Sequence, residues 1–167
     1  DALKDAFQQA FERIWRGDAE NDGFNDLILA AGLDWRQTAM LRACCKYLLQ
    51  TGVPFSQAYM EQALCKYPLH ARLLVELFEA KFDPAREQPS RTVVETARKR
   101  MARELAPLFG EEIDRLHPHL IESLGAVRGE ARERQVEAAV KAIGAVMDSV
   151  ESVDEDRILR SFMAVSR

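Results

Sequence analysis

The chain has 167 residues, of which 47% are hydrophobic and 30% charged, and its formal net charge is −4. This balance is typical of a globular protein and excludes a disordered chain. No apolar run approaches the ~20 residues of a membrane-spanning helix. Acidic and basic residues are interleaved, whereas a nucleic-acid-binding surface needs a concentrated basic patch. We therefore expect neither a membrane nor nucleic acid as a partner.

The first segment predicts a helix with one apolar face, because apolar residues recur at three- and four-residue spacing. These residues are Leu3, Phe7, Phe11, Ile14 and Trp15. Gly17 is expected to end this helix, since glycine adopts the left-handed cap conformation without a steric clash. A polar loop follows to Gly23, and then a short helix over Asn25–Ala31, which Gly32 stops.

Three further helices are expected before residue 85. Asp34 caps the first of them, which ends at Gly52, and Ser56 caps the second. Pro68 interrupts the second helix because proline has no amide hydrogen. The third predicted helix, Leu69–Phe82, has a dense apolar stripe and ends at Asp83-Pro84; we expect this stripe to form core.

The second half contains longer, more charged segments. Ser90 is predicted to cap a helix that Pro107 kinks or breaks, and the segment 130–150 again has helical apolar spacing. Ser152 and Glu155 form a capping box for the last helix. No segment alternates with the period of a strand, so we predict an all-α fold, a multi-helix bundle or two packed helical lobes with no sheet. The predicted division is an N-terminal lobe at 1–84, a linker at 85–89 and a C-terminal lobe at 90–167.

Candidate chemistry is sparse. His117 and His119 lie near Glu111, Glu112 and Asp114, but zinc sites need three or four converging ligands and no second ligand pair of recognisable spacing follows. We interpret this stretch as a solvated helix end. Phosphate-binding glycine loops are absent from the sequence. We therefore predict no catalytic, cofactor-binding or metal-binding residue in this chain.

Three cysteines are an odd number, which favours reduced thiols and a cytoplasmic location over a disulfide scaffold. Cys44 and Cys45 are adjacent rather than spaced as in redox motifs, and Cys45 shares an apolar face with Leu41 and Leu48. It is therefore interpreted as a buried small hydrophobe. Cys65 follows one helix later.

Other polar and aromatic candidates have structural explanations. Ser56 lacks histidine and aspartate partners, and its capping role accounts for it. Glutamates interrupt the basic run at 91–103, which indicates a solvated helix face rather than a polyanion site. Its basic residues are Arg91, Arg98, Lys99, Arg100 and Arg103. Trp35 and Phe55 are predicted to be core anchors, with a neighbouring domain as the alternative contact.

Seven short segments carry a resemblance to a known family; they are Phe24–Leu27, Ala30–Leu33, Asp34–Arg36, Leu41–Ala43, Pro54–Tyr59, Leu73–Pro84 and Ser152–Arg160. They resemble the large NAD-specific glutamate dehydrogenases of bacteria. The resemblance is strongest from Phe24 to Pro84 and from Ser152 to Arg167. Cys44-Cys45 departs from the family, where a tyrosine is frequent, and is interpreted as a packing variant.

The resemblance implies a helical region upstream of the catalytic domain of an enzyme that converts glutamate to 2-oxoglutarate and ammonia with NAD. None of that family's catalytic or NAD-binding motifs has a counterpart here, so this chain is expected to be architectural or regulatory. Its implied partners are other domains of the same polypeptide and neighbouring subunits of a homo-oligomer. Asp1 is not an initiator methionine and the chain stops within a helical segment, which favours an excised domain.

Two alternatives remain open from the sequence. The chain could be a stand-alone helical protein-interaction module that receives a partner helix. The boundary between its lobes could also hold a small-molecule effector.

Overall fold

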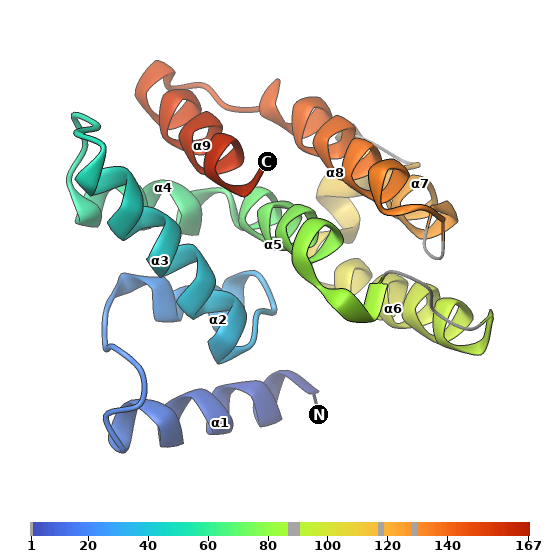
Figure 1. Cartoon of the computed structure of the whole chain (residues 1–167), viewed down its shortest axis with the longest axis horizontal. Helices are drawn as coiled ribbons and strands as arrows, with labels where there is room; N and C mark the ends of the chain where they lie inside the picture. Colours follow the sequence, from blue (N-terminus) through green and yellow to red (C-terminus); the bar gives the residue numbers. More distant parts are fainter. Residues whose placement is uncertain (1, 87–90, 117–118, 128–129) are drawn as a thin grey trace. The chain divides into compact units, whose positions relative to one another are not determined.

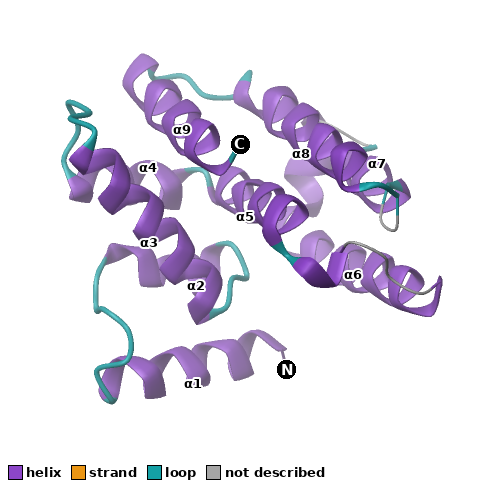
Figure 2. Ribbon diagram, viewed as in Figure 1, coloured by secondary structure: helices purple, strands orange, loops and turns teal. Residues whose placement is uncertain are grey.

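The computed structural model describes residues 2–86, 91–116, 119–127 and 130–167. Every regular element within these ranges is a helix (Figures 1 and 2), so the predicted all-α class is confirmed. The α-helices are α1 (Ala2–Trp15), α2 (Leu27–Ala30), α3 (Trp35–Gln50), α4 (Gln57–Lys66), α5 (Pro68–Phe82), α6 (Arg91–Leu116), α7 (Leu120–Ala126), α8 (Arg132–Met147) and α9 (Val153–Ser166). Two 3₁₀ helices, η1 (Gly23–Asp26) and η2 (Pro84–Arg86), complete the set.

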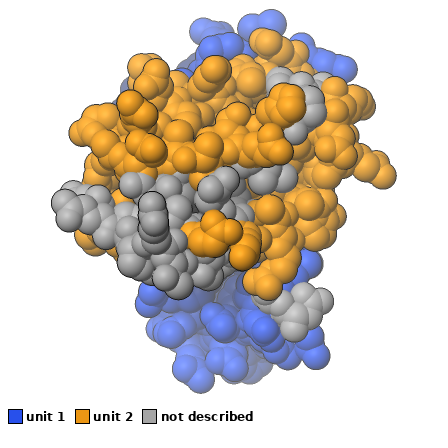
Figure 3. Space-filling view, turned by 90° about the vertical axis from the view of Figure 1, so that its right-hand side faces the viewer, with its two compact units in different colours: residues 1–75, 151–166 blue, residues 76–150, 167 orange. Residues whose placement is uncertain are grey.

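Two compact units divide the chain (Figure 3). The first contains residues 1–75 and 151–166, and the second contains residues 76–150 together with residue 167. The predicted linker at 85–89 falls inside the second unit, and residues 87–90 lie outside the described ranges. This grouping also places α9 with the N-terminal helices. It does not test the predicted division into lobes at 1–84 and 90–167, which stays a prediction.

The predicted helix ends of the first unit are confirmed by their caps. Gly17, Gly32 and Gly52 adopt positive φ angles of 79°, 61° and 80° where α1, α2 and α3 end, a conformation that costs glycine little. The Asp34 carboxylate accepts from the amides of Arg36 and Gln37, each at 2.8 Å. The Gln37 side chain accepts from the Asp34 amide, which completes a capping box.

Ser56 and Pro68 mark the boundaries between α3, α4 and α5. Ser56 Oγ accepts from the Tyr59 amide at 3.2 Å, as predicted. Pro68 ends α4 in the expected way and occupies the first position of α5, where its missing amide hydrogen has no helical partner to lose.

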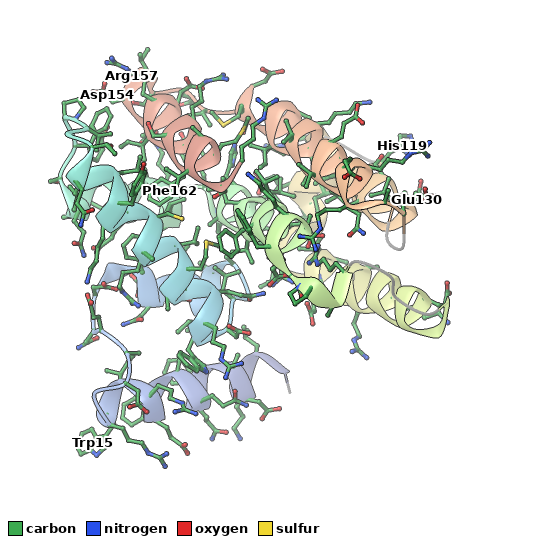
Figure 4. All side chains as sticks on the ribbon, in the orientation of Figure 1. Trp15, His119, Glu130, Asp154, Arg157 and Phe162 are labelled. Carbon is green, nitrogen blue, oxygen red and sulfur yellow. The ribbon has the colours of Figure 1, made fainter. Side chains whose placement is uncertain are left out.

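The core of the first unit is built from distant parts of the sequence. α9 packs against α3 and α4, and Phe162 is fully buried on the side of α9 that faces α3 (Figure 4). The fully buried Phe24, Leu41 and Leu64 come from η1, α3 and α4. Burying large apolar side chains from several helices is the main driving force for this unit.

The helix α5 is buried along most of its length. Its interior residues Leu73, Leu74 and Leu77 have exposed fractions of 1% or less, which confirms that the predicted stripe forms core. Toward its end the helix opens to solvent, since Phe82 is 50% exposed and packs against Phe78.

In the second unit, α6 continues through Pro107, so the predicted break does not occur. An internal proline costs a helix about 3 kcal/mol. Leu105, Phe109 and Ile113 of α6 are each at most 3% exposed, and α6 packs against α7. Burial of large side chains stabilises by about 1.5–3 kcal/mol each, so packing outweighs the local preference of proline.

Candidate functional site

The polar loop before η1 is held by a buried ion pair. Arg42 on α3 donates to both carboxylate oxygens of Asp22, from Nε at 2.6 Å and from Nη2 at 2.7 Å. Its Nη2 also donates to the Glu20 carbonyl and to Asn25 Oδ1, and its guanidinium lies 5.8 Å from the Phe24 ring centre. Asp22 caps η1 as well, by accepting from the Phe24 amide. A bidentate arginine–carboxylate pair fixes geometry strongly, so this cluster positions the loop on α3.

A second buried carboxylate joins α9 to α4. Glu155 accepts from Lys66 Nζ at 2.9 and 2.8 Å and from the Tyr67 hydroxyl at 2.8 Å. The hydrogen bond from Lys66 is the main reason why the pKa of Glu155 lies below its ordinary value. Ser152 Oγ accepts from the Glu155 amide at 3.4 Å, which confirms that half of the predicted capping box. The Glu155 side chain instead accepts hydrogen bonds from Lys66 of α4 and from Tyr67, the residue after that helix.

The second unit has its own buried cation. Arg86 is held by Glu76 at 2.8 Å and by Glu79 at 2.5 Å. Burial of the guanidinium disfavours its charge, but the two carboxylates outweigh burial and raise the pKa of Arg86. The Arg86 carbonyl in turn accepts from Gln135 on α8. These contacts fix the segment after α5 against α8.

Arg132 on α8 binds the carboxyl end of α5. Its guanidinium donates to the Lys81 carbonyl and, at 3.4 Å, to the Asp83 carbonyl. The last carbonyls of a helix lack intrahelical donors and carry partial negative charge. Arg132 therefore supplies both the missing donors and a favourable charge.

The three cysteines are free thiols, and Cys44 and Cys45 are buried whereas Cys65 is half-buried. Cys45 is fully buried together with Leu41 and Leu48, which confirms its interpretation as a small hydrophobe. Burial raises the pKa of Cys45 and that of Cys65 to about 11, and burial also raises the pKa of Cys44. Since the thiolate is the reactive form, these side chains are poorly suited to nucleophilic or redox chemistry.

The histidine stretch is described only in part. His119 is exposed and lies 3.4 Å from Glu122, while His117 lies outside the described residues. Glu111 and Asp114 are exposed on α6, and Glu112 is half-buried. Within the described ranges, no three His, Cys, Asp or Glu side chains are grouped so that they could hold a metal ion.

The basic run in α6 lies along a solvated helix face where the structure describes it. Lys99 pairs with Glu95 at 3.5 Å, and both side chains are more than half exposed. Arg103 is exposed as well. The side chains of Arg91, Arg98 and Arg100 lie outside the description.

The two aromatic candidates are partly buried rather than central. Two guanidinium groups lie over the Trp35 ring, those of Arg13 and Arg36, at 5.0 and 5.2 Å from the ring centre. Trp35 thereby joins α1 to the start of α3. Phe55 packs edge-on against Tyr59 with ring centres 5.9 Å apart.

A shallow hollow of about 530 Å³ lies between α3 and α9. Its lining residues carry no charge; they are Tyr47, Leu48, Thr51, Ser161, Ala164 and Val165. Walls of this kind can contact an apolar group, and they offer no charged side chain to an anion or a metal ion.

Among the described residues, sequence reasoning missed the burial of three charged side chains, those of Arg42, Arg86 and Glu155. Arg42 interrupts the buried face of α3, and a charged residue at such a position needs a partner. The acidic loop that supplies Asp22 could have suggested one. Glu155 was interpreted from its spacing to Ser152, which gives its backbone role but not its distant side-chain partners.

In the described residues no helix is both long and apolar enough to cross a lipid bilayer. No solved structure matches this chain significantly. The family model for the helical motif 3 of glutamate dehydrogenase matches residues 19–84. This range contains most of the segments that suggested the resemblance.

Curated relatives extend the match. An NAD-specific glutamate dehydrogenase of Mycobacterium tuberculosis is 36% identical over 159 residues, which is 95% of this chain and 7% of the relative. The enzyme of Pseudomonas aeruginosa is 34% identical over 161 residues, 96% of this chain and 8% of the relative. That of Halomonas elongata is 42% identical over 99 residues, 59% of this chain and 6% of the relative.

The chain thus spans less than a tenth of the length of these relatives. The matches confirm the resemblance: residues 19–84 match the helical motif 3 of glutamate dehydrogenase, and 95–96% of the chain is similar to a segment of NAD-specific glutamate dehydrogenases.

Proposed function

We propose that this chain is a non-catalytic, architectural or regulatory helical part of a large NAD-dependent glutamate dehydrogenase. The whole enzyme would convert glutamate to 2-oxoglutarate and ammonia, with NAD bound outside this chain. This helical part would lie upstream of the catalytic domain of the enzyme. The observation that carries the proposal is similarity over 95–96% of the chain to enzymes of that name.

The use of its buried charges supports an architectural role. Arg42, Glu155 and Arg86 are each bound by side chains of other helices or loops. An active site would instead hold such groups available to a substrate, with pKa values tuned for proton transfer. Cys44 and Cys45 are buried and Cys65 is half-buried, and the raised pKa of each thiol disfavours nucleophilic chemistry at these positions.

The partners in this proposal are other domains of the same polypeptide and neighbouring subunits of a homo-oligomer, in the cytoplasm. A regulatory role would require two arrangements with different affinity for an effector. An effector site within the chain is tested by calorimetric titration with amino acids at millimolar concentration, and no saturable heat would contradict it.

The test of the function is glutamate-dependent reduction of NAD by the full-length product of the gene that encodes this chain. The 167-residue chain alone is assayed beside it. We expect activity in the full-length protein and none in the isolated chain. Activity in the isolated chain would contradict the non-catalytic assignment, and its absence from a folded full-length protein would contradict the assignment to this enzyme. In that case the stand-alone interaction module becomes the better reading.

A further inference from the structure

One helix of the first unit carries large apolar side chains that the unit does not cover. Phe7, Phe11 and Trp15 of α1 have exposed fractions of 48%, 58% and 82%. Four-residue spacing places them in one row, here called the aromatic ridge, and the Phe11 and Trp15 rings stack with centres 6.2 Å apart. Figure 4 shows Trp15 projecting away from the ribbon.

The apolar arc of α1 is wider than one packed face requires. Successive residues of a helix are about 100° apart around its axis, so Leu3, Ala6, Ala10 and Ile14 form an arc that the ridge continues. The combined apolar arc is about 180° wide, whereas a helix that packs on one surface needs an apolar stripe of roughly 100°. The unit buries Ala10 fully and the other three at least in part. The remaining half of the arc is the ridge, so α1 has the pattern of a helix that is covered from two sides.

The position of α1 on its unit is well fixed. It packs against α2 and α3, and Arg13 both stacks over Trp35 and binds Asp18 at 3.0 Å. After the helix, the Gly17 amide donates to the Ile14 carbonyl and the Asp18 amide donates to the Arg13 carbonyl. The ridge is therefore held outward by a docked helix.

The size of the ridge indicates how it is covered. At 150–250 Å² per aromatic side chain, the exposed fractions correspond to roughly 400 Å² of apolar surface. A stable complex between separate proteins buries about 800 Å² per partner, so this ridge alone is small for a free partner or a second copy. A tethered domain needs less area, because its effective concentration reaches the millimolar range. In the relatives, more than nine-tenths of the polypeptide lies outside the segment that this chain matches.

We propose that the aromatic ridge Phe7–Phe11–Trp15 is an intramolecular docking surface, covered by an apolar surface elsewhere in the same polypeptide. The proposal rests on the proposed function, since it requires a longer chain around this segment. It assigns to α1 the contact through which this helical region is joined to the remainder of the enzyme.

Hydroxyl-radical footprinting of the isolated 167-residue chain and of the full-length protein tests this proposal. Mass spectrometry reports the oxidation of Phe7, Phe11 and Trp15 individually. We expect oxidation of all three to fall at least tenfold in the full-length protein. Equal oxidation in the two proteins would overturn the proposal. Protection that arises in the isolated chain as its concentration increases would also overturn it, because a second copy would then be the partner.

A matched pair of triple variants of the full-length protein supplies the second readout. One carries F7S, F11S and W15S, and the control carries Q9S, E12S and R16S, which are exposed positions on the other side of α1 and in the turn directly after it. We expect limited proteolysis within residues 17–23 to accelerate about tenfold in the ridge variant only. Equal rates in the two variants would contradict docking through the ridge.

Glutamate-dependent NAD reduction, measured on the same unmodified full-length sample, separates the two proposals. Activity with an unprotected ridge would overturn the docking surface alone. A protected ridge in a folded but inactive protein would overturn the proposed function alone.

Discussion

The helices α1 and α9 are similar in length and apolar spacing, but they differ in how much of their apolar face is buried. Each has 14 residues and one apolar face, and both belong to the first unit. α9 buries Ile158, Leu159 and Phe162 to an exposed fraction of at most 1%, whereas α1 leaves Phe7, Phe11 and Trp15 about half exposed or more. Apolar periodicity therefore predicts a helix, but it does not determine which surface covers that helix.

Each helix meets two others, and the difference lies in how much of its apolar face those neighbours cover. α9 meets both α3 and α4, and Glu155 adds polar contacts to Lys66 and Tyr67. α1 meets α2 and α3 on only one part of a wider apolar arc. The chain thus stabilises its last helix internally and presents half of its first helix to solvent.

The largest expected effect on stability comes from removing the Phe162 ring of α9 from the core of the first unit. Phe162→Ala should lower the free energy of unfolding of the first unit by about 3–5 kcal/mol, because a fully buried ring is lost and a cavity remains. Urea denaturation followed by tryptophan fluorescence measures this directly, since both tryptophans of the chain lie in that unit. Arg157→Ala, an exposed change on the same helix, is the control and should stay within about 0.5 kcal/mol. A loss below 1 kcal/mol for Phe162→Ala would mean that α9 is not part of this core.

The next effect concerns the loop that connects α1 to the rest of its unit. Arg42→Ala should cost about 3 kcal/mol, because Asp22 would stay partly buried without its partner. Lys46→Ala removes another ion pair to the same loop, with Glu20, in which both side chains are about half exposed. That control should cost less than about 1 kcal/mol. Equal losses in the two variants, measured by urea denaturation, would contradict the assigned role of Arg42.

A smaller effect, with a defined pH dependence, is expected at the start of α9. Glu155→Gln should cost about 1–2 kcal/mol at neutral pH through its weakened hydrogen bonds. The folded-state pKa of Glu155 is below its ordinary value near 4.5, so the stabilisation is fully present above pH 4.5. It is lost as the pH falls below 4.5 and through the lowered pKa. Urea midpoints of wild type and variant at pH 7, 5, 4 and 3.5 should therefore converge on acidification.

Asp154→Asn is the matched control for this pH series, since Asp154 is an exposed carboxylate in the same first turn of α9. It reports the interaction of a charge with the helix dipole, worth about 0.3–1 kcal/mol. If both variants have the same pH profile, then the dipole, and not Lys66 and Tyr67, explains the stabilisation by Glu155.

The fold class and most helix ends could be predicted from local chemistry. Gly17, Gly32, Gly52, Asp34 and Ser56 act through their own backbone neighbours, so the sequence around them contains the needed information. Pro107 is the informative exception. Its local preference against a helix interior was correctly identified, but the burial of Leu105 and Phe109 outweighs it, and that burial depends on distant residues.

The environments of charged and aromatic side chains could not be predicted in the same way. Glu155 and Lys66 are 89 residues apart, and no spacing rule connects them. The apolar row of α1 was predicted correctly as a helix face, yet three of its five residues are exposed. Helical periodicity reports only which side chains share a face; their burial is decided by tertiary partners.

The smallest expected effect on stability is at Trp15 of the partly exposed helix α1. Trp15→Ala should change the free energy of unfolding of the isolated chain by no more than about 0.5 kcal/mol, because an 82% exposed ring gives up little burial. Its stacking on Phe11 is mostly solvated and adds little to that figure. Circular dichroism at 222 nm is the suitable readout, since the substitution removes one of the two fluorescent tryptophans. A loss above about 1.5 kcal/mol would mean that Trp15 is covered in the isolated chain. In that event α1 would resemble α9, and the contrast from which the docking surface is inferred would not hold.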